Sequence, residues 1–351
     1  MIRCRIQQKG ISKICHARAS EKFKEIDGST TTGANIFCVA EIFLFPQGSV
    51  CVKWQAANIN KPSKLMKNKV LLSAALAFAF AMPVAIAQSI PDEFKTGGFA
   101  IGCQAYTFNR FTAFEAIEKT AQAGGKVIEF YPGQKLSKEE PTLKIDHDAS
   151  AEVLAKVQAK LKAHGMKAVN YGVVSIPEDE AAARKVFEFA KKMGIPIITT
   201  ESVQSINMIE KMVKEYDIRV GFHNHPGSFG KADYKVWNPL YIAGVLVGRD
   251  SRIGAAADTG HWCTSGLNPV EGLRILKGRI VSAHLKDKLA FGESHDVPYG
   301  EGVANIKGCL DELKAQGFSG NISIEYEYNW DNSVPDVTKC IDFVRAYGQA
   351  K

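Results

Sequence analysis

The sequence predicts an α/β protein, a (β/α)8 barrel of the TIM-barrel type, on three observations. Eight short β-prone runs alternate with helical segments from Gly98 onward. This alternation is typical of a parallel sheet. Eight repeats in about 250 residues match the barrel in number and in length. The alternative, an open doubly wound sheet, usually has fewer strands and often a glycine-rich phosphate turn. No GxGxxG or GxxxxGK[ST] sequence follows any of the eight runs.

The predicted elements follow one another regularly along the chain. The strand-like runs are residues 99–106, 126–131, 167–173, 196–202, 219–225, 252–258, 280–286 and 321–328. Helical patterns cover residues 111–125, 148–165, 177–194, 268–278, 305–317 and 334–348. The segment 177–194 has the clearest boundaries, with acidic residues in its first turn, lysines in its last turn and Gly194 after it. These features match the helix dipole and the C-cap preference for glycine.

The segment before the predicted barrel has the three parts of a secretory signal peptide. Met66 begins a short basic stretch, an apolar run follows from Val70 to Ala81, and the small-x-small triplet Ala85–Ala87 precedes Gln88. A membrane anchor or a buried helix is the alternative, but the apolar run is short for a stable span. We therefore expect residues 66–87 to be a signal peptide and residues 88–351 to be one barrel exported to the bacterial periplasm. Residues 1–65 are a doubtful upstream extension, and we expect the true start at Met66.

The charge distribution argues against a nucleic-acid partner, whereas the cysteine content excludes few functions. Residues 1–87 hold 12 Lys and Arg and 4 Asp and Glu, which leaves 32 basic and 33 acidic residues from position 88 onward. A nearly neutral barrel does not suggest a nucleic-acid partner. No stable membrane anchor is expected after cleavage. The cysteines of the barrel have no zinc-type pair spacing, and we interpret them as small core residues: Cys103, Cys263, Cys309 and Cys340.

Polar residues gather at the ends of the predicted strands, where barrels of this kind form their active sites. A single Glu or His at such a position is more often a solvated rim residue or a structural histidine. Here the fifth to eighth strands all offer His or carboxylate groups, so the side chains can converge on one point. In strand order, the candidates are Glu129, Asn170, Glu201, His223 with His225, Asp258, His284 with Lys286, and Glu325 with Glu327.

Imidazole and carboxylate groups together suit a divalent ion such as Mn²⁺, Zn²⁺, Fe²⁺ or Co²⁺. Alternate residues of a strand point the same way, so His223 and His225 in "HNH" face one side. One of them is expected to bind the ion and the other to support it or to contact substrate. Alternation alone does not choose between them.

Several further residues have two interpretations, one structural and one functional. His261, in "AADTGHW", is either a loop or helix-start residue or a substrate-binding group. Lys286 and Glu129 are either acid/base or substrate-binding groups or a surface ion pair. Glu293 and His295 lie in the long glycine-containing segment after the seventh strand, and they are weaker candidates.

Four motifs together resemble the sugar-phosphate isomerase/epimerase family, the xylose-isomerase-like TIM barrels, over roughly residues 98–349. They are "AADTGHW", "SAHLKDK", "SIEYEY" and "VPYGEGVANIKGCLDEL". The resemblance implies a divalent ion, most often Mn²⁺ with Zn²⁺, Co²⁺ and Mg²⁺ as alternatives, held by one residue from each of strands five to eight. On this sequence those residues are Asp258, His284 and Glu325, and His261 is the histidine of the family's D-x-x-H motif.

The chain departs from the family pattern at the fifth strand. The usual ligand there is Glu, and the position that aligns with it is His223, within the exported "HNH" branch. Family epimerases use two glutamates as acid/base groups, so this change alters the pair. Glu201 on the neighbouring strand is a candidate to supply the missing carboxylate. The expected metal ligands are therefore His223, Asp258, His284 and Glu325.

The resemblance implies a metal-dependent isomerase or epimerase that acts through an enediolate on a non-phosphorylated sugar or keto-sugar. The expected catalytic groups are Glu325, Lys286, Glu201 and His225, and the expected substrate contacts are Glu129, His261, Asn170 and Glu327. A 3-keto-glycoside lyase or hydratase is the leading alternative. An endonuclease-four-like DNA-repair enzyme is disfavoured by the neutral charge balance, and a non-catalytic sugar-binding protein is the third possibility. The oligomeric state is not predicted.

Overall fold

The fold is taken from a computed structural model that describes residues 2–8, 11–17, 36–44, 50–58, 90–230 and 232–350. The chain divides into two compact units, Met1–Val84 and Ala85–Lys351. In the first unit, β1 (Ile2–Gln8) pairs with β2 (Ile11–Ala17), and β3 (Ile36–Leu44) pairs with β4 (Val50–Asn58), both antiparallel. The predicted signal peptide and the proposed start at Met66 lie outside the described residues.

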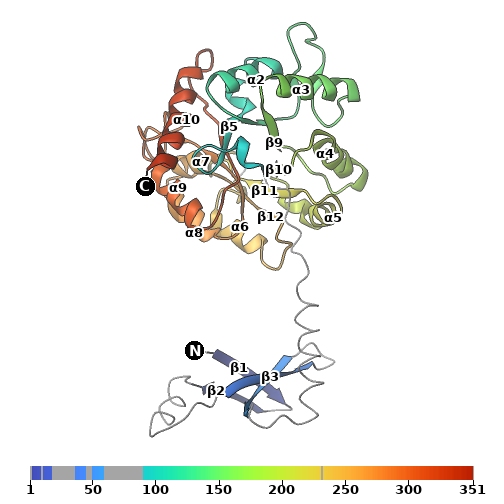
Figure 1. Cartoon of the computed structure of the whole chain (residues 1–351), viewed down its shortest axis with the longest axis vertical. Coiled ribbons are helices and arrows are strands. Elements are labelled where there is room, and N and C mark those ends of the chain that lie inside the picture. Colours follow the sequence, from blue (N-terminus) through green and yellow to red (C-terminus); the bar gives the residue numbers. More distant parts are fainter. Residues whose placement is uncertain are drawn as a thin grey trace. The chain divides into compact units, whose positions relative to one another are not determined.

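The second unit contains a closed barrel of eight parallel strands (Figure 1). Neighbouring strands follow one another in chain order, and β16 closes against β5. Each strand lies within one of the eight predicted runs, so the predicted (β/α)8 fold is confirmed. The strands are β5 (Ala100–Gln104), β6 (Val127–Phe130), β9 (Lys167–Tyr171), β10 (Ile197–Thr200), β11 (Arg219–His223), β12 (Ile253–Asp258), β13 (Ile280–Leu285) and β16 (Asn321–Ile324).

Most of the helices surround the strands on the outside of the barrel, whereas α7 lies inside that ring, directly after β12 (Figure 1). They are α2 (Ala113–Gln122), α3 (Ala151–Ala163), α4 (Glu180–Met193), α5 (Ile206–Tyr216), α6 (Pro239–Val245), α7 (Thr259–Thr264), α8 (Pro269–Ile275), α9 (Ile306–Ala315) and α10 (Val334–Gln349). Short 3-10 helices occur at η1 (Asp92–Phe94), η2 (Ala105–Phe108) and η3 (Val203–Ser205). Short antiparallel pairs join β7 (Gln134–Lys135) to β8 (Lys144–Ile145) and β14 (Asp287–Lys288) to β15 (Asp296–Val297).

The helix boundaries follow from local side-chain chemistry. Thr112 and Glu115 form a reciprocal capping box at the start of α2. The Asp179 side chain accepts the Ala182 N–H at the start of α4, and Gly194 ends that helix with a φ of 66°. This left-handed conformation is costly for residues with a Cβ atom, so glycine is favoured there. The predicted boundaries of segment 177–194 are therefore correct to within a few residues.

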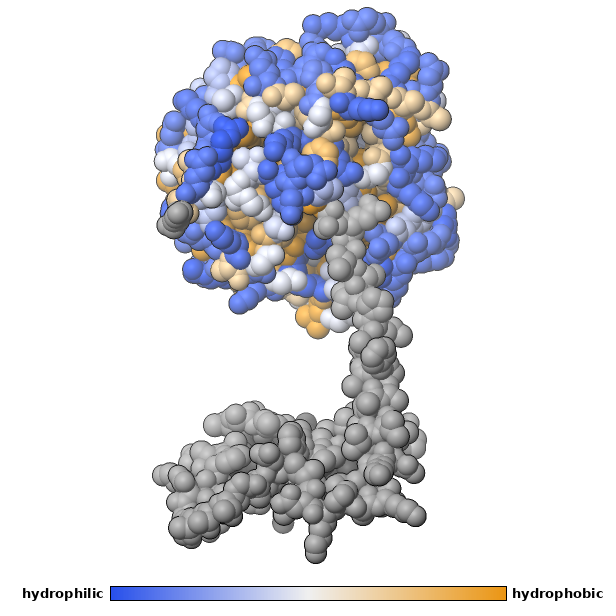
Figure 2. All heavy atoms as spheres, in the orientation of Figure 1, coloured by the Kyte–Doolittle hydropathy of each residue, from blue (hydrophilic) through white to orange (hydrophobic). Residues whose placement is uncertain are grey.

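The apolar core lies mainly between the strands and the helices. α4, for example, buries Val186, Phe187, Phe189, Ala190 and Met193. Figure 2 shows hydrophilic residues over most of the barrel face in view. The four cysteines of the barrel are buried free thiols, as expected for core residues. Among the described residues, no helix has the length and apolarity needed to span a membrane.

Inside the barrel lies a set of neutral polar side chains, here called the interior polar layer: Asn170, Thr199, Ser282, Asn321 and Ser323. Asn170 donates from Nδ2 to Thr199 Oγ1 at 2.8 Å and to Ser282 Oγ at 3.2 Å. Asn321 donates to Ser282 Oγ at 3.1 Å and to Ser323 Oγ at 2.9 Å. Hydrogen bonds within the layer replace those that these side chains would make to water.

Candidate metal centre and active site

Asp258 lies at the boundary between a strand and a helix. It is the last residue of β12 and the N-cap of α7, and its Oδ1 accepts the His261 N–H at 2.8 Å. Aspartate is favoured at N-caps because its carboxylate can accept such an N–H. The second oxygen, Oδ2, is buried and has no hydrogen-bond partner within the described residues. Oδ1 therefore caps the N-terminus of α7, and Oδ2 faces the other side chains of the site.

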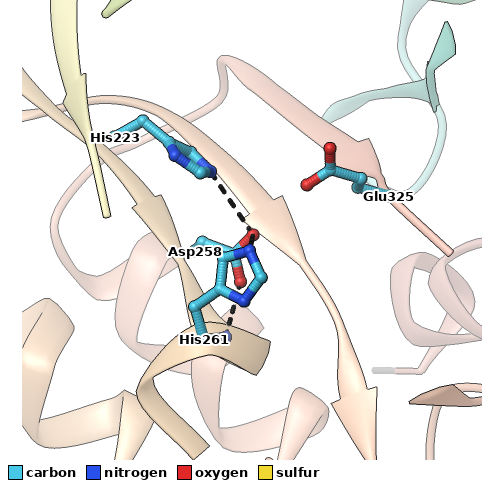
Figure 3. Close-up of side chains that lie close together, drawn as sticks. All are labelled: His223, Asp258, His261 and Glu325. Carbon is cyan, nitrogen blue, oxygen red and sulfur yellow. Dashed lines mark hydrogen bonds and ion pairs between the residues drawn. The ribbon is translucent and has the colours of Figure 1, made fainter. Parts of the chain in front are cut away.

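A compact group forms around this free oxygen (Figure 3). One ligand atom from each of His223, Asp258, His261 and Glu325 lies within 4.8 Å of the other three, and all four residues are buried. His223 Nε2 lies 3.5 Å from Asp258 Oδ2, and His261 Nε2 lies 3.6 Å from the same oxygen. His261 belongs to helix α7 rather than to a loop, and its backbone N–H bond to Asp258 fixes its position.

Of the two ring nitrogens of His284, Nδ1 is the one that faces this group. Its Nδ1 lies 3.1 Å from Glu325 Oε2 and 3.7 Å from Asp258 Oδ2, whereas its Nε2 lies 3.0 Å from Glu129 Oε2. Glu129 is fully buried, and its Oε2 also accepts the hydroxyl of Ser323 at 2.8 Å. Histidines that bind metals commonly donate their other N–H to a carboxylate. Glu129 thus lies behind His284, on the side away from Asp258.

His223 shows a similar arrangement with a second carboxylate. Its Nδ1 lies 3.5 Å from Glu201 Oε1, and its Nε2 faces Asp258. The residue is 1% exposed, and neither ring nitrogen has a hydrogen-bond partner among the described residues. Burial of an unpaired polar atom costs about 1–3 kcal/mol. His223 Nε2 and Asp258 Oδ2 are therefore two ligand atoms without a hydrogen bond, and Asp258 Oδ2 has only ion-pair contacts, with Lys286 Nζ the nearest at 3.3 Å.

The charges of the group are set by burial and by neighbouring ions. Burial opposes ionisation of Asp258 and Glu325, but Lys286 and nearby histidines outweigh it, so the pKa of each carboxyl group is held well below its usual value. Burial lowers the pKa of His261 well below its usual value, because the attraction of Asp258 does not compensate for lost solvation. The group therefore combines two carboxyl groups of lowered pKa with an imidazole of lowered pKa.

Lys286 follows β13 directly, and its ammonium group lies against the same oxygens. Its Nζ is 2.8 Å from Glu325 Oε2, 2.6 Å from Glu327 Oε2 and 3.3 Å from Asp258 Oδ2. His261 Nε2 lies 3.2 Å away. Because Lys286 and Glu129 are both buried, the alternative interpretation of them as a surface ion pair is wrong.

His225 lies beside this group and is partly exposed. Its Nδ1 is 2.6 Å from Glu201 Oε1, and the Tyr234 hydroxyl donates to the same oxygen at 2.8 Å. Its ring stacks on Phe229, with the two ring centroids 4.1 Å apart. The rings of His223 and His225 are 4.8 Å apart, so both histidines face the same side, as the strand pattern predicts.

Three of the expected residues lie outside this arrangement. Asn170 belongs to the interior polar layer, where Thr199 and Ser282 accept its amide hydrogens. His295 stacks on Tyr328, with centroids 3.9 Å apart. Glu293 is exposed on the segment between β14 and β15.

Two residues that position the site were not predicted from the sequence. Asn224 exchanges hydrogen bonds with the backbone of Asp258, donating to its carbonyl at 3.1 Å and accepting its N–H at 2.9 Å. This side chain joins the ends of β11 and β12 just where the fifth strand stops. Tyr234 holds Glu201 from the segment before α6. Its place between the two histidines of "HNH", at the end of a predicted strand, was the signal in the sequence that could have indicated Asn224.

The donor set fits a divalent ion. Asp258 Oδ2, Glu325 Oε2, His284 Nδ1 and His223 Nε2 come from four successive strands of the barrel, and His261 Nε2 lies close enough to replace one of them. Mixed nitrogen and oxygen donors of this kind suit Mn²⁺, Zn²⁺ or Co²⁺. The compact cluster contains three of the four ligands expected from the sequence, His223, Asp258 and Glu325, with His261 as its fourth member. The fourth expected ligand, His284, lies beside this cluster, with Nδ1 3.1 Å from Glu325 Oε2.

Comparison with known proteins identifies the family. The sequence profile described as "Xylose isomerase-like TIM barrel" matches residues 117–347. The chain belongs to the xylose isomerase-like TIM barrel family. A solved structure of an uncharacterised protein from Parabacteroides distasonis is 32% identical, with a TM-score of 0.58, over 71% of this chain and 99% of that one. The structure of a D-tagatose 3-epimerase-like protein is 17% identical, with a TM-score of 0.55, over 70% of this chain and 96% of that one, and shows the same barrel fold.

Curated relatives match over shorter stretches. Protein MJ1311 of Methanocaldococcus jannaschii, which is uncharacterised, is 27% identical over 154 residues, 43% of this chain and 49% of its own length. An L-ribulose-5-phosphate 3-epimerase of Salmonella paratyphi B is 37% identical over 70 residues, 20% of this chain and 24% of its own length. The chain thus spans half or less of the length of these curated relatives.

Proposed function

We propose that this protein is a divalent-metal-dependent sugar isomerase or epimerase that moves a proton beside a carbonyl group. The observation that carries the proposal is the convergence of buried ligand atoms from four successive strands. Two of these atoms, His223 Nε2 and Asp258 Oδ2, have no hydrogen-bond partner within the described residues. A purely structural cluster would pair them, as the interior polar layer pairs most of its own atoms.

The comparisons support this class of reaction. The matched relatives include a protein named as an L-ribulose-5-phosphate 3-epimerase, and the similar folds include a D-tagatose 3-epimerase-like protein. Fold likeness alone does not assign an activity. The proposal therefore rests on the site, and these names supply the substrate class.

Asp258, Glu325, His284 and His223 would hold the ion, with His261 as the alternative nitrogen ligand. Bound there, a divalent ion would supply Lewis-acid polarisation of a substrate carbonyl and its neighbouring hydroxyl. Mn²⁺ is our first choice, and Zn²⁺, Co²⁺ and Mg²⁺ are alternatives. Glu129 and Glu201 would fix the orientation of His284 and His223, because each carboxylate can accept the N–H that points away from the ion.

The acid/base groups lie on two sides of this centre. Glu201 accepts the Nδ1–H of His225, so the Nε2 of His225 carries a free electron pair and can take a proton from carbon. Glu201 then stabilises the imidazolium ion that results. The Lys286 ammonium group, directly after β13, can return a proton from the other side, and the ionised Glu325, directly after β16, holds that ammonium group in place at 2.8 Å. Return to the opposite face of the same carbon gives epimerisation, and return to the neighbouring carbon gives isomerisation.

We propose a non-phosphorylated sugar or keto-sugar as substrate. No glycine-rich phosphate turn follows any strand in the sequence. The signal-peptide pattern of residues 66–87 adds a second reason, because phosphorylated sugars are mostly cytoplasmic and we propose export to the periplasm. N-terminal sequencing of the exported protein checks this. A mature chain should begin near Gln88, and residues 1–65 still attached would disprove both the cleavage site and the start at Met66.

A lyase or hydratase acting on a 3-keto-glycoside is a second candidate for the same site. The observation that favours it is His223, which replaces the carboxylate that family epimerases use as an acid/base group. Proton abstraction by His225 would be unchanged. A β-substituent would then leave from the neighbouring carbon, with its proton supplied by the Lys286 ammonium group.

The deciding experiment combines metal analysis with solvent-exchange assays. The purified mature protein should hold about one divalent ion per chain, and incubation with keto-sugars in D2O should place deuterium on the carbon beside the carbonyl. Recovery of an epimer or isomer supports the first candidate, and loss of a substituent supports the second. Asp258→Asn, which keeps the N-cap oxygen, is the matched control. If the wild-type protein holds no metal and shows no deuterium exchange, the non-catalytic sugar-binding protein remains as the alternative.

A further inference from the structure

The side chain of Lys286 is fully buried beside the proposed metal ligands. Its Nζ contacts Glu325 Oε2 at 2.8 Å and Asp258 Oδ2 at 3.3 Å. These are the oxygens that also face His284 Nδ1. The ammonium group and a divalent ion would therefore contact the same two oxygen atoms.

The position of Lys286 is fixed by the elements around it. Its N–H donates to Thr259 Oγ1 at 2.9 Å, and the Thr259 hydroxyl donates to its carbonyl at 3.0 Å. Gly260, at the start of α7, packs against it so closely that an added Cβ would lie 2.3 Å from Lys286 Cβ. The lysine stem is therefore tightly packed against Gly260, and its Nζ lies between the carboxylates and His261 Nε2.

We propose that Lys286 sets the affinity of the metal centre by sharing Asp258 Oδ2 and Glu325 Oε2 with the ion. The inference rests on the proposed metal-dependent function. A carboxylate oxygen has two acceptor positions, so one oxygen can serve the ion and the ammonium group together. The two positive charges repel each other inside a buried site, and this repulsion weakens the ion's binding.

Glu327 has the opposite effect in this arrangement. Its Oε2 accepts from Lys286 Nζ at 2.6 Å, and its side chain is 26% exposed, so it lies on the solvent side of the lysine. It provides a negative charge that offsets the ammonium group without being one of the proposed ligands. Removal of this charge would leave the lysine to interact more strongly with Asp258 and Glu325, and metal binding should weaken.

The lysine also provides N–H groups at the edge of the centre. Its contact with His261, at 3.2 Å, places Nζ next to a residue expected to bind substrate. A substrate oxygen there could accept a hydrogen bond from the ammonium group. Loss of Lys286 should therefore change two measurements in opposite directions, with tighter metal binding and slower turnover. A lysine with only a structural role would not produce tighter metal binding.

The test is a calorimetric titration of chelator-treated protein with Mn²⁺ alone. Lys286→Met should lower the dissociation constant at least about tenfold, since even a partly screened repulsion between buried charges exceeds that factor. Glu327→Gln should raise the dissociation constant by several-fold. The control is Arg252→Met with Asp250→Asn, which removes an ion pair just before β12, at the end of that strand opposite Asp258, with neither residue a proposed ligand. This control should leave the dissociation constant unchanged.

The outcomes separate this inference from the proposed function. A wild-type protein that binds no Mn²⁺ disproves the metal centre itself. A wild type that binds Mn²⁺, with equal or weaker affinity in folded Lys286→Met, disproves only the role of Lys286. If Lys286→Met does not fold, as judged by circular dichroism, Glu327→Gln decides the question, and an unchanged dissociation constant there overturns the inference.

Discussion

The barrel encloses two sets of buried polar side chains that differ in how they are satisfied. The interior polar layer consists of neutral amides and hydroxyls that hydrogen-bond to one another across β9, β10, β13 and β16. The strand-end group around Asp258 consists of carboxylates and imidazoles, and it leaves ligand atoms of His223 and Asp258 without hydrogen-bond partners in the described part of the chain. The same barrel therefore contains one largely closed network and one open network.

The difference separates structural residues from functional ones. A polar layer that pairs most of its own atoms, with Asn321 Oδ1 the exception within the described residues, stabilises the barrel. A charged group with unpaired atoms is unfavourable in the free protein, and it is retained where a ligand supplies the missing partner. Asn170 and Glu129 lie on strands whose ends looked equally promising in the sequence, yet Asn170 belongs to the first network and Glu129 links the two through Ser323 and His284.

The largest expected effect comes from removing a ligand of the open network. His284→Ala should lose most of the bound metal and nearly all turnover, because Nδ1 is one of four proposed donors and Glu129 keeps only its contacts with Ser323 and Asn321. The barrel should still fold, since its apolar core is untouched. Metal content measured by mass spectrometry, with circular dichroism as the folding check, tests this. Full metal occupancy would remove His284 from the site.

The two histidines of "HNH" should separate into different roles. His223→Ala should lower metal affinity, because its Nε2 faces Asp258. His225→Ala should keep the metal and lower kcat and kcat/KM together by about 10²–10⁴-fold, the usual contribution of a general base. Turnover is measured at saturating Mn²⁺ after titration of both variants. If His225→Ala loses the ion and His223→Ala keeps it, the assignment is reversed.

The charged network should also make stability depend on pH. The folded-state pKa of Asp258 lies below its unfolded value, so its contribution to the free energy of unfolding is complete above about pH 4 and disappears as the pH falls through the lower folded-state pKa. Metal-free Asp258→Asn should lack this contribution. Urea unfolding of both proteins between pH 6 and 2 (values set around the ordinary Asp pKa of about 4) gives the difference. A constant difference across that range would contradict the assignment.

The smallest effect is expected in the closed network. Asn170→Ala should reduce the free energy of unfolding by about 1–3 kcal/mol, because Thr199 and Ser282 lose a buried partner. Metal affinity and turnover should stay within about twofold of the wild type, since Asn170 contacts no proposed ligand among the described residues. Urea denaturation and Mn²⁺ titration of the same preparation check both parts. A large loss of turnover in a folded variant would instead indicate that Asn170 contacts the substrate, as the sequence predicted.

The alternation of apolar runs predicted the barrel because strand and helix periods are local properties of the chain. Polar residues at the ends of those runs predicted the members of the site for the same reason. Local sequence patterns do not show which atoms of distant residues come into contact in the folded protein. Glu129 and His284 are 155 positions apart, and Glu201 and Tyr234 are 33 positions apart. The facing nitrogen of each histidine, the burial of Lys286 and the burial of Glu129 depend on such contacts, and so they required the three-dimensional structure.

The two oxygens of Asp258 have consequences for the order of events when an ion arrives. The Oδ1 bond to the His261 N–H joins residues only three positions apart, so it can form as soon as the first turn of α7 forms. The rotamer of Asp258 is then restricted before any ion is present, and Oδ2 is preorganised. Little conformational entropy remains to be lost at this ligand on binding. We therefore expect the ion to enter a site whose central oxygen barely moves, with any adjustment made by Lys286 and Glu327.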